Sequence, residues 1–107
     1  MIEYKVKVCG YKTEWYNLQG KLHRIDGPAV EYADGDKAWY LNGQLHREDG
    51  PATEGNNEGN RYKQWWINGH LHRVDGPAVE WCNGYKEWYI DGQQLTEEEF
   101  NNKNKKQ

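Results

Sequence analysis

One phrase occurs three times in this chain of 107 residues, and this repetition limits the possible folds more than any other feature. The three copies read LHRIDGPAVEY, LHREDGPATEG and LHRVDGPAVEW, at residues 22–32, 45–55 and 71–81. An aromatic phrase alternates with them, and its tryptophans Trp15, Trp39, Trp65 and Trp88 are separated by 24, 26 and 23 residues. A unit this short, with two turn signals, has room for two strands but not for a helix. The sequence therefore predicts an all-β fold, a single antiparallel meander of about four tandem β-hairpin units.

The turns follow from dipeptides that favour a left-handed backbone. Asn42-Gly43, Asn68-Gly69 and Asp91-Gly92 predict two-residue hairpin turns, because both central residues of such turns have positive φ. We expect Asp34-Gly35 and Asn83-Gly84 to close the alternate hairpins in the same way, and residues 18–20 to form a three-residue loop. Turn length sets the strand register, which then places Trp39 opposite both His46 and Val30, and Val79 opposite Trp88.

Two segments depart from the repeat. The polar stretch GNNEGN at 55–60 has no apolar anchor, so we expect a mobile loop there. Thr96 and Glu99 form a capping-box pattern, which predicts a short C-terminal helix with Phe100 packed over the last hairpin. The chain is thus divided into a β-hairpin repeat domain at 1–95 and a helix with a frayed tail at 96–107, the fraying being expected from 101 onward.

Composition excludes several classes of function. The net charge is −3, whereas binders of duplex nucleic acid usually carry a clustered basic face. No apolar run reaches the ~18 residues of a membrane span, and the charged start MIEYKVKV is unlike a signal peptide. Cys9 and Cys82 are interpreted as free thiols of a cytoplasmic protein. The chain has 6 Trp and 8 Tyr but one Met, so we expect its core to be built from aromatic rings.

Each return phrase contains a histidine near an aspartate, which raises the question of metal binding or acid–base catalysis. A zinc site needs three or four converging ligands, whereas His23, His46 and His72 belong to different hairpins. We therefore expect each ring to pack on the tryptophan across the strand pair, with no metal, no cofactor and no catalytic residue. The chain contains neither an activated nucleophile pattern nor a phosphate-binding loop, so it is predicted not to be an enzyme.

Two rows of side chains are the candidate partner-binding residues. Alternation places one aromatic residue per unit on the face opposite the tryptophan row, and tyrosine and tryptophan are enriched at binding hot spots. These residues are Tyr16, Tyr40, Trp66 and Tyr89. The second row consists of Arg24, Arg47 and Arg73, which either serve the scaffold or bind an anionic ligand.

The aromatic pair, the glycine turn and the LHR-x-DGPA return together resemble MORN-type hairpin repeats over residues 3–95. That resemblance implies a single-layer meandering sheet that contacts proteins or lipids and has no catalytic activity. The chain departs from it by replacing much of the glycine–tyrosine phrasing with His-Arg-x-Asp. It is also similar to small phage and bacterial proteins that end in LTEEEF.

These resemblances imply a protein–protein interaction module, encoded by a phage and directed against a bacterial defence or host protein in the host cytoplasm. One alternative is a protein that sequesters a small anionic ligand such as a nucleotide, using the arginine row and aromatic stacking. Another is a structural repeat with no activity of its own.

Overall fold

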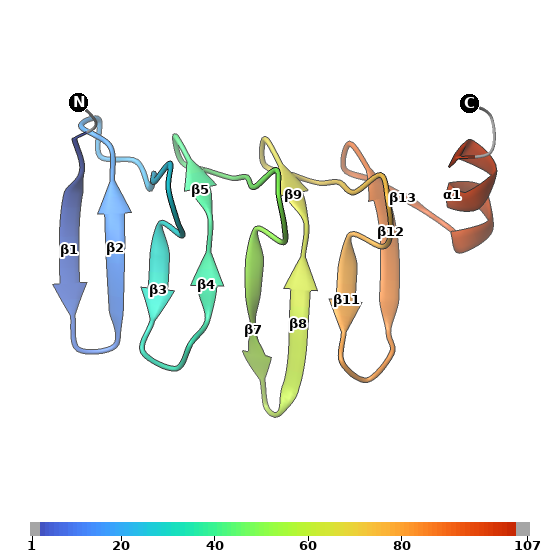
Figure 1. The fold of residues 1–107 in the computed structure, drawn as a ribbon, viewed down its shortest axis with the longest axis horizontal. Helices are drawn as coiled ribbons and strands as arrows, with labels where there is room; N and C mark the ends of the chain where they lie inside the picture. The colour runs from blue at the N-terminus through green and yellow to red at the C-terminus, as the bar shows by residue number, and fades with distance from the viewer. Residues whose placement is uncertain (1–2, 105–107) are drawn as a thin grey trace.

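The computed structural model describes residues 3–104 and shows a row of β-hairpins standing side by side (Figure 1). The main sheet has nine antiparallel strands: β1 (Lys5–Cys9), β2 (Lys12–Tyr16), β3 (Val30–Tyr32), β4 (Lys37–Ala38), β7 (Thr53–Asn57), β8 (Asn60–Gln64), β11 (Val79–Trp81), β12 (Lys86–Ile90) and β13 (Gln93–Leu95). Two small sheets pair β5 (Tyr40–Leu41) with β6 (Gln44–Leu45) and β9 (Trp66–Ile67) with β10 (His70–Leu71). Helix α1 (Glu97–Asn104) follows. The predicted all-β meander with a short C-terminal helix is confirmed.

The turns at Asp34-Gly35 and Asn83-Gly84 have three residues, one more than the sequence predicted. The Asn42-Gly43 turn has two residues, with φ of 49° and 85°, and it pairs Tyr40 with Leu45 as predicted. The turn near Asp34 is a three-residue loop, because the Tyr32 N–H donates to the Asp36 carbonyl and only Gly35 has positive φ. The same loop recurs at residues 82–84, where the Trp81 N–H donates to the Tyr85 carbonyl.

The extra residue in each three-residue loop shifts the register by one position. Val30 therefore pairs with Ala38 and not with Trp39. Val79 likewise pairs with Glu87 and not with Trp88. Because a shift of one residue moves a side chain to the other face of a sheet, these two predicted pairings were wrong about the faces as well.

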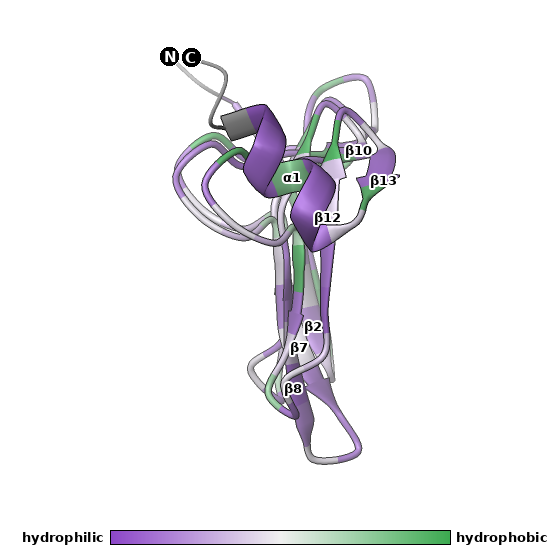
Figure 2. Ribbon diagram, turned by 90° about the vertical axis from the view of Figure 1, so that its right-hand side faces the viewer, coloured by the Kyte–Doolittle hydropathy of each residue, from purple (hydrophilic) through white to green (hydrophobic). Residues whose placement is uncertain are grey.

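The polar segment at 55–60 forms an ordered hairpin, so the predicted mobile loop was wrong. Strands β7 and β8 extend to Asn57 and Asn60, and Glu58 and Gly59 make a two-residue turn with φ of 52° and 85°. Polar residues are tolerated there because this end of the hairpin is a single layer with water on both sides (Figure 2).

Burial is concentrated where the return segments cross the sheet, and small residues supply it. The shortest dimension of the molecule, with the return segments and α1 included, is 17 Å. Ala29, Ala52 and Ala78 have no exposed surface, whereas Val30 and Val79 are 4% exposed. No large side chain of the described residues is completely buried. The expected core of aromatic rings is therefore replaced by half-buried rings around a line of alanines.

Helix α1 begins as its capping pattern predicts and covers the last hairpin. The Thr96 N–H donates to the Glu99 carboxylate at 2.8 Å, and the Glu99 N–H donates to the Thr96 hydroxyl at 3.1 Å. Phe100 is 4% exposed, and the helix contacts β12 and β13. The helix continues to Asn104, so the fraying expected from residue 101 was wrong up to that point, while 105–107 lie outside the described residues.

The alanine line gives the first testable prediction. In Ala52→Val, the added methyl groups enter a site with no exposed surface and crowd its neighbours, so the free energy of unfolding should fall by about 1–3 kcal/mol in urea denaturation. Ala33→Val is the control, because Ala33 is exposed in its loop and should tolerate the same change. Equal stability of the two variants would show that the site can expand.

Candidate protein-binding surface

The strand register divides the side chains between two faces of the sheet. Opposed residues of antiparallel strands point to the same side, so the pairs Gln64–Val79 and Tyr62–Trp81 share one face. Trp66 is on that face too, because its indole N–H donates to the Gln64 side-chain oxygen at 3.0 Å. We call this side the aromatic face, and its rings are Tyr16, Tyr32, Tyr40, Tyr62, Trp66, Trp81, Tyr85 and Tyr89.

The other side, the loop face, carries the tryptophans Trp15, Trp39, Trp65 and Trp88. Three return segments, residues 22–28, 45–51 and 71–77, cross it and bulge from one side of the sheet in the edge-on view (Figure 2). The structure thus places Tyr16, Tyr40, Trp66 and Tyr89 opposite the tryptophan row, as the sequence predicted. Val30, which had been expected opposite Trp39, lies on the aromatic face because of the register shift, and Tyr32 lies on that face with it.

On the loop face, each arginine of the return phrase stacks on the tryptophan of its own unit. The guanidinium carbon lies 3.9 Å from the ring centre for Arg24 on Trp15, and 3.8 Å for both Arg47 on Trp39 and Arg73 on Trp65. A cation held over an indole is attracted by the negative potential of the ring face.

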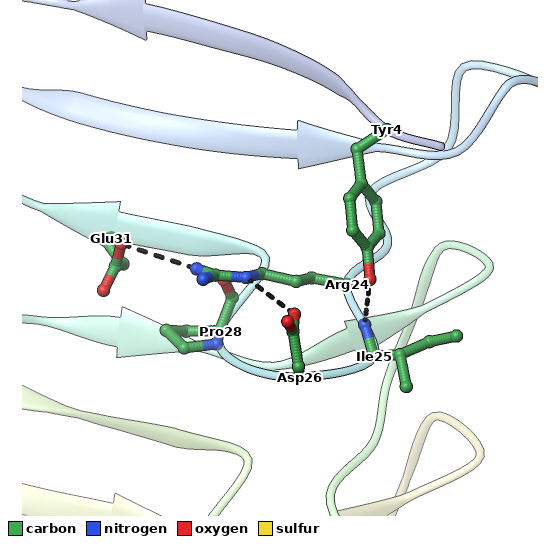
Figure 3. Close-up of polar contacts among 6 residues, drawn as sticks. All are labelled: Tyr4, Arg24, Ile25, Asp26, Pro28 and Glu31. Atoms are coloured by element: carbon green, nitrogen blue, oxygen red, sulfur yellow. Dashed lines mark hydrogen bonds and ion pairs between the residues drawn. The ribbon is translucent and has the colours of Figure 1, made fainter. Parts of the chain in front are cut away.

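Further contacts hold each guanidinium in this position. For Arg24, Nε donates to Asp26 at 3.3 Å and a terminal nitrogen donates to the Pro28 carbonyl at 3.2 Å, with Glu31 3.6 Å away (Figure 3). Arg47 and Arg73 repeat the contacts to aspartate and to the proline carbonyl. The Arg-x-Asp-Gly-Pro phrase is therefore a closed local structure around one guanidinium.

The glycine of this phrase allows the guanidinium to approach the backbone closely. A Cβ atom on Gly50 would lie 3.0 Å from the guanidinium carbon of Arg47, and Gly27 and Gly76 are equally close to their arginines. Each guanidinium therefore lies between an indole ring and a glycine backbone. The three arginine side chains are only 21–24% exposed, and two nitrogens of each guanidinium are already bonded within the chain. These contacts support a scaffold role for Arg24, Arg47 and Arg73.

The histidines of the return phrases bond to the next unit, and within residues 3–104 no histidine ring stacks on a tryptophan, so that expectation was wrong. The Nδ1 atoms of His23, His46 and His72 accept the N–H of Asn42, Asn68 and Asp91 at 2.9, 3.0 and 2.9 Å. The arginine occupies the tryptophan face, which leaves the imidazole free to turn toward the following turn. Because Nδ1 accepts, the neutral ring carries its hydrogen on Nε2.

Backbone bonds complete the link between units. The Leu22 carbonyl accepts the Gly43 N–H at 2.8 Å, and the Arg24 N–H donates to the Tyr40 carbonyl at 3.1 Å. The second and third returns repeat both bonds to the units that follow them. The leucine, histidine and arginine of each return phrase therefore hydrogen-bond one hairpin to the next.

Within residues 3–104 no return segment crosses the aromatic face, and four of its rings are partly accessible. Tyr16, Tyr40, Trp66 and Tyr89 are half-buried. Burial raises the pKa of Tyr40 and Tyr89. A carboxylate two residues away on the same face raises the pKa of Tyr16 and of Tyr85. These phenols remain neutral hydrogen-bond donors well into the alkaline range, which suits contact with a polar partner surface.

A second row of rings, which the sequence did not predict, lies nearer the hairpin turns. Tyr62 and Trp81 have ring centres 5.2 Å apart and line a groove of ≈ 610 Å³. Burial, followed by the Asp36 carboxylate, raises the pKa of Tyr62. The sequence does show that Tyr32 and Trp81 each come directly before a turn. Their face could be assigned only once each of these turns was known to have three residues.

The part of the chain that the structure describes has neither a metal-ligand cluster nor a helix that could span a membrane. Within residues 3–104, no three side chains of His, Cys, Asp or Glu converge as metal ligands. Over the same residues, no helix has the length and the apolar character needed to cross a membrane. Cys9 and Cys82 are free and exposed.

The arginine stack gives a second prediction. Arg47→Lys keeps the charge but loses the planar group that fits between Trp39 and Gly50, so unfolding free energy should fall by about 1–2 kcal/mol. Arg61→Lys, at an exposed position of β8, is the matched control. Gly50→Ala should cost a similar amount, and the two changes together should cost less than their sum, because both disturb one contact. Strict additivity in urea denaturation would contradict this arrangement.

The histidine link gives a third prediction. His46→Asn keeps a side-chain acceptor near the position of Nδ1, whereas His46→Leu leaves the Asn68 N–H without its partner. The leucine variant should lose about 1–2 kcal/mol of unfolding free energy, and the asparagine variant should lose clearly less. If leucine is the better tolerated of the two, the hydrogen bond does not stabilise the junction between the units.

Comparison with known protein families, with curated proteins and with solved structures finds no match to this chain. The resemblance to MORN-type repeats and to small phage proteins therefore stays a prediction.

Proposed function

We propose that this chain is a non-catalytic module that binds a partner protein through its aromatic face. The observation that carries the proposal is the asymmetry of the sheet: return segments cross one face, while the other presents a ring on each unit. A flat array of Tyr and Trp with polar groups between them has the composition of protein-binding hot spots.

The size of the face supports this proposal. The outline of the whole molecule measures 44 by 33 Å in its two longer dimensions, which is large enough for one side of it to supply the ~800 Å² per partner that a standard interface buries. Within the face, Trp66 stands between Tyr40 and Tyr89 of the neighbouring units. Trp66 is the only tryptophan in this row, and a large ring near the middle of a patch is the usual form of an anchor residue.

The alternative, sequestration of a small anionic ligand by the arginine row, has weaker support. Each guanidinium is stacked on a ring, bonded to an aspartate and bonded to a proline carbonyl, so much of its capacity for an added anion is used. The resemblance to phage and bacterial proteins makes a bacterial defence or host protein the first partner to look for. Affinity capture from a bacterial lysate is the corresponding search, with the Trp66→Ala variant as the matched bait.

Two tryptophan variants test the proposal. Trp66→Ala should remain folded and weaken binding of the captured partner by ~2 kcal/mol or more in calorimetry, because it removes the central ring of the aromatic face. Trp39→Ala should lower unfolding free energy by about 3 kcal/mol or more, because it also removes the ring beneath Arg47.

The two variants separate binding from folding. If Trp66→Ala unfolds as readily as Trp39→Ala, the ring at Trp66 belongs to the scaffold. If it folds and binds its partner at full strength, the interface lies on another surface.

A further inference from the structure

One edge of the nine-stranded sheet is open. In the described residues no strand pairs with the outer side of β1, whereas at the other end β13 and α1 lie against β12 (Figure 1). All five residues of β1 are exposed, and Val6 and Val8 are 53% and 72% exposed. An exposed strand edge offers unpaired N–H and C=O groups to another extended chain.

The register tells which backbone groups of β1 point outward. Trp15 donates its N–H to the Ala29 carbonyl, away from β1. Residues opposed in an antiparallel pair alternate between bonded and non-bonded pairs, so Val6, which faces Trp15, belongs to a non-bonded pair. The N–H and C=O groups of Val6, and of Val8 two residues on, are therefore directed away from the sheet.

The side chains of this edge specify the chemistry of an added strand. Lys5 and Lys7 lie on the aromatic-face side, and within residues 3–104 neither has a carboxylate at ion-pair distance. The carboxylate nearest in register to Lys7, that of Glu14, is 3.3 Å from Lys12 instead. Val6 and Val8 lie on the opposite side. Lysines on an edge discourage unselective pairing, and opposed charges on neighbouring strands attract.

We propose that β1 accepts an extended segment of a partner protein as a tenth strand, and that this segment alternates acidic with apolar residues. Its carboxylates lie opposite Lys5 and Lys7, while its apolar side chains lie beside Val6 and Val8. Main-chain bonds supply affinity and the alternating side chains supply selectivity, as in other cases of strand addition. This edge borders the aromatic face at Lys5, which is opposite Tyr16, but the proposal does not depend on the function proposed for that face.

The test uses the full chain and a labelled synthetic peptide in which glutamate alternates with valine, followed by fluorescence anisotropy. The chain should bind this peptide at least tenfold more tightly than a matched peptide with lysine in place of glutamate. In nuclear magnetic resonance spectra, the largest amide shifts on binding should fall on β1. Trp66→Ala should bind the peptide like the unaltered chain, which separates this edge from the aromatic face.

Two variants locate the contact. Val8→Pro removes an outward N–H that no intrachain bond uses, so it should retain the melting temperature of the parent and lose at least tenfold in peptide affinity. Lys5→Gln with Lys7→Gln keeps every backbone group, and it should abolish the preference for the acidic peptide. If the proline variant fails to fold, the peptide preference of the double glutamine variant tests whether the peptide binds at β1.

Several outcomes would overturn the proposal. They are the absence of peptide binding, equal binding of the acidic and basic peptides, and full affinity in a folded Val8→Pro variant. Concentration-dependent self-association in analytical ultracentrifugation that Val8→Pro abolishes would assign the edge to a second copy of this chain.

Discussion

The stacking of an arginine guanidinium between an indole ring and a glycine backbone is the contact on which the rest of this structure depends. It occurs three times, at Trp15–Arg24–Gly27, Trp39–Arg47–Gly50 and Trp65–Arg73–Gly76. The stack holds the return segment against the sheet, and this position brings a leucine carbonyl and a histidine Nδ1 to the turn of the next unit. A molecule only 17 Å across in its shortest dimension has little interior to bury, so a repeated local contact and the links that it positions supply much of the order.

The same contact makes the two faces unequal. Return segments occupy one side of the sheet and satisfy the arginines there, so the rings of the other side have no covering segment within the described chain. The last unit has Leu95 and Thr96 where the others have histidine and arginine, and helix α1 with its buried Phe100 replaces the return segment. One end of the sheet is thereby covered while β1 stays open at the other. An open edge and an uncovered aromatic face are both surfaces suited to contacts with other chains.

Local rules worked where a short stretch of sequence contains the whole cause. Asn-Gly and Asp-Gly turns need two left-handed residues, so Asn42-Gly43 set the pairing of Tyr40 with Leu45 correctly. The capping box of Thr96 and Glu99 likewise set the start of α1. Such rules failed at Asp34-Gly35, because an Asp-Gly pair also fits a three-residue loop in which only the glycine is left-handed. That difference of one residue placed Val30 on the face opposite to the predicted one.

The sequence by itself determined the repeat, the antiparallel meander, the C-terminal helix and the separation of Tyr40 and Trp66 from the tryptophan row, because period and alternation are properties of the chain. Only the tertiary structure decided which side chain covers each tryptophan. Arginine and histidine are neighbours in every return phrase, and both can pack on an indole. The choice depends on a guanidinium fitting between Trp39 and Gly50 while the imidazole of His46 reaches an N–H of the next unit. Both conditions join residues of separate segments, so they exist only once the hairpins stand side by side.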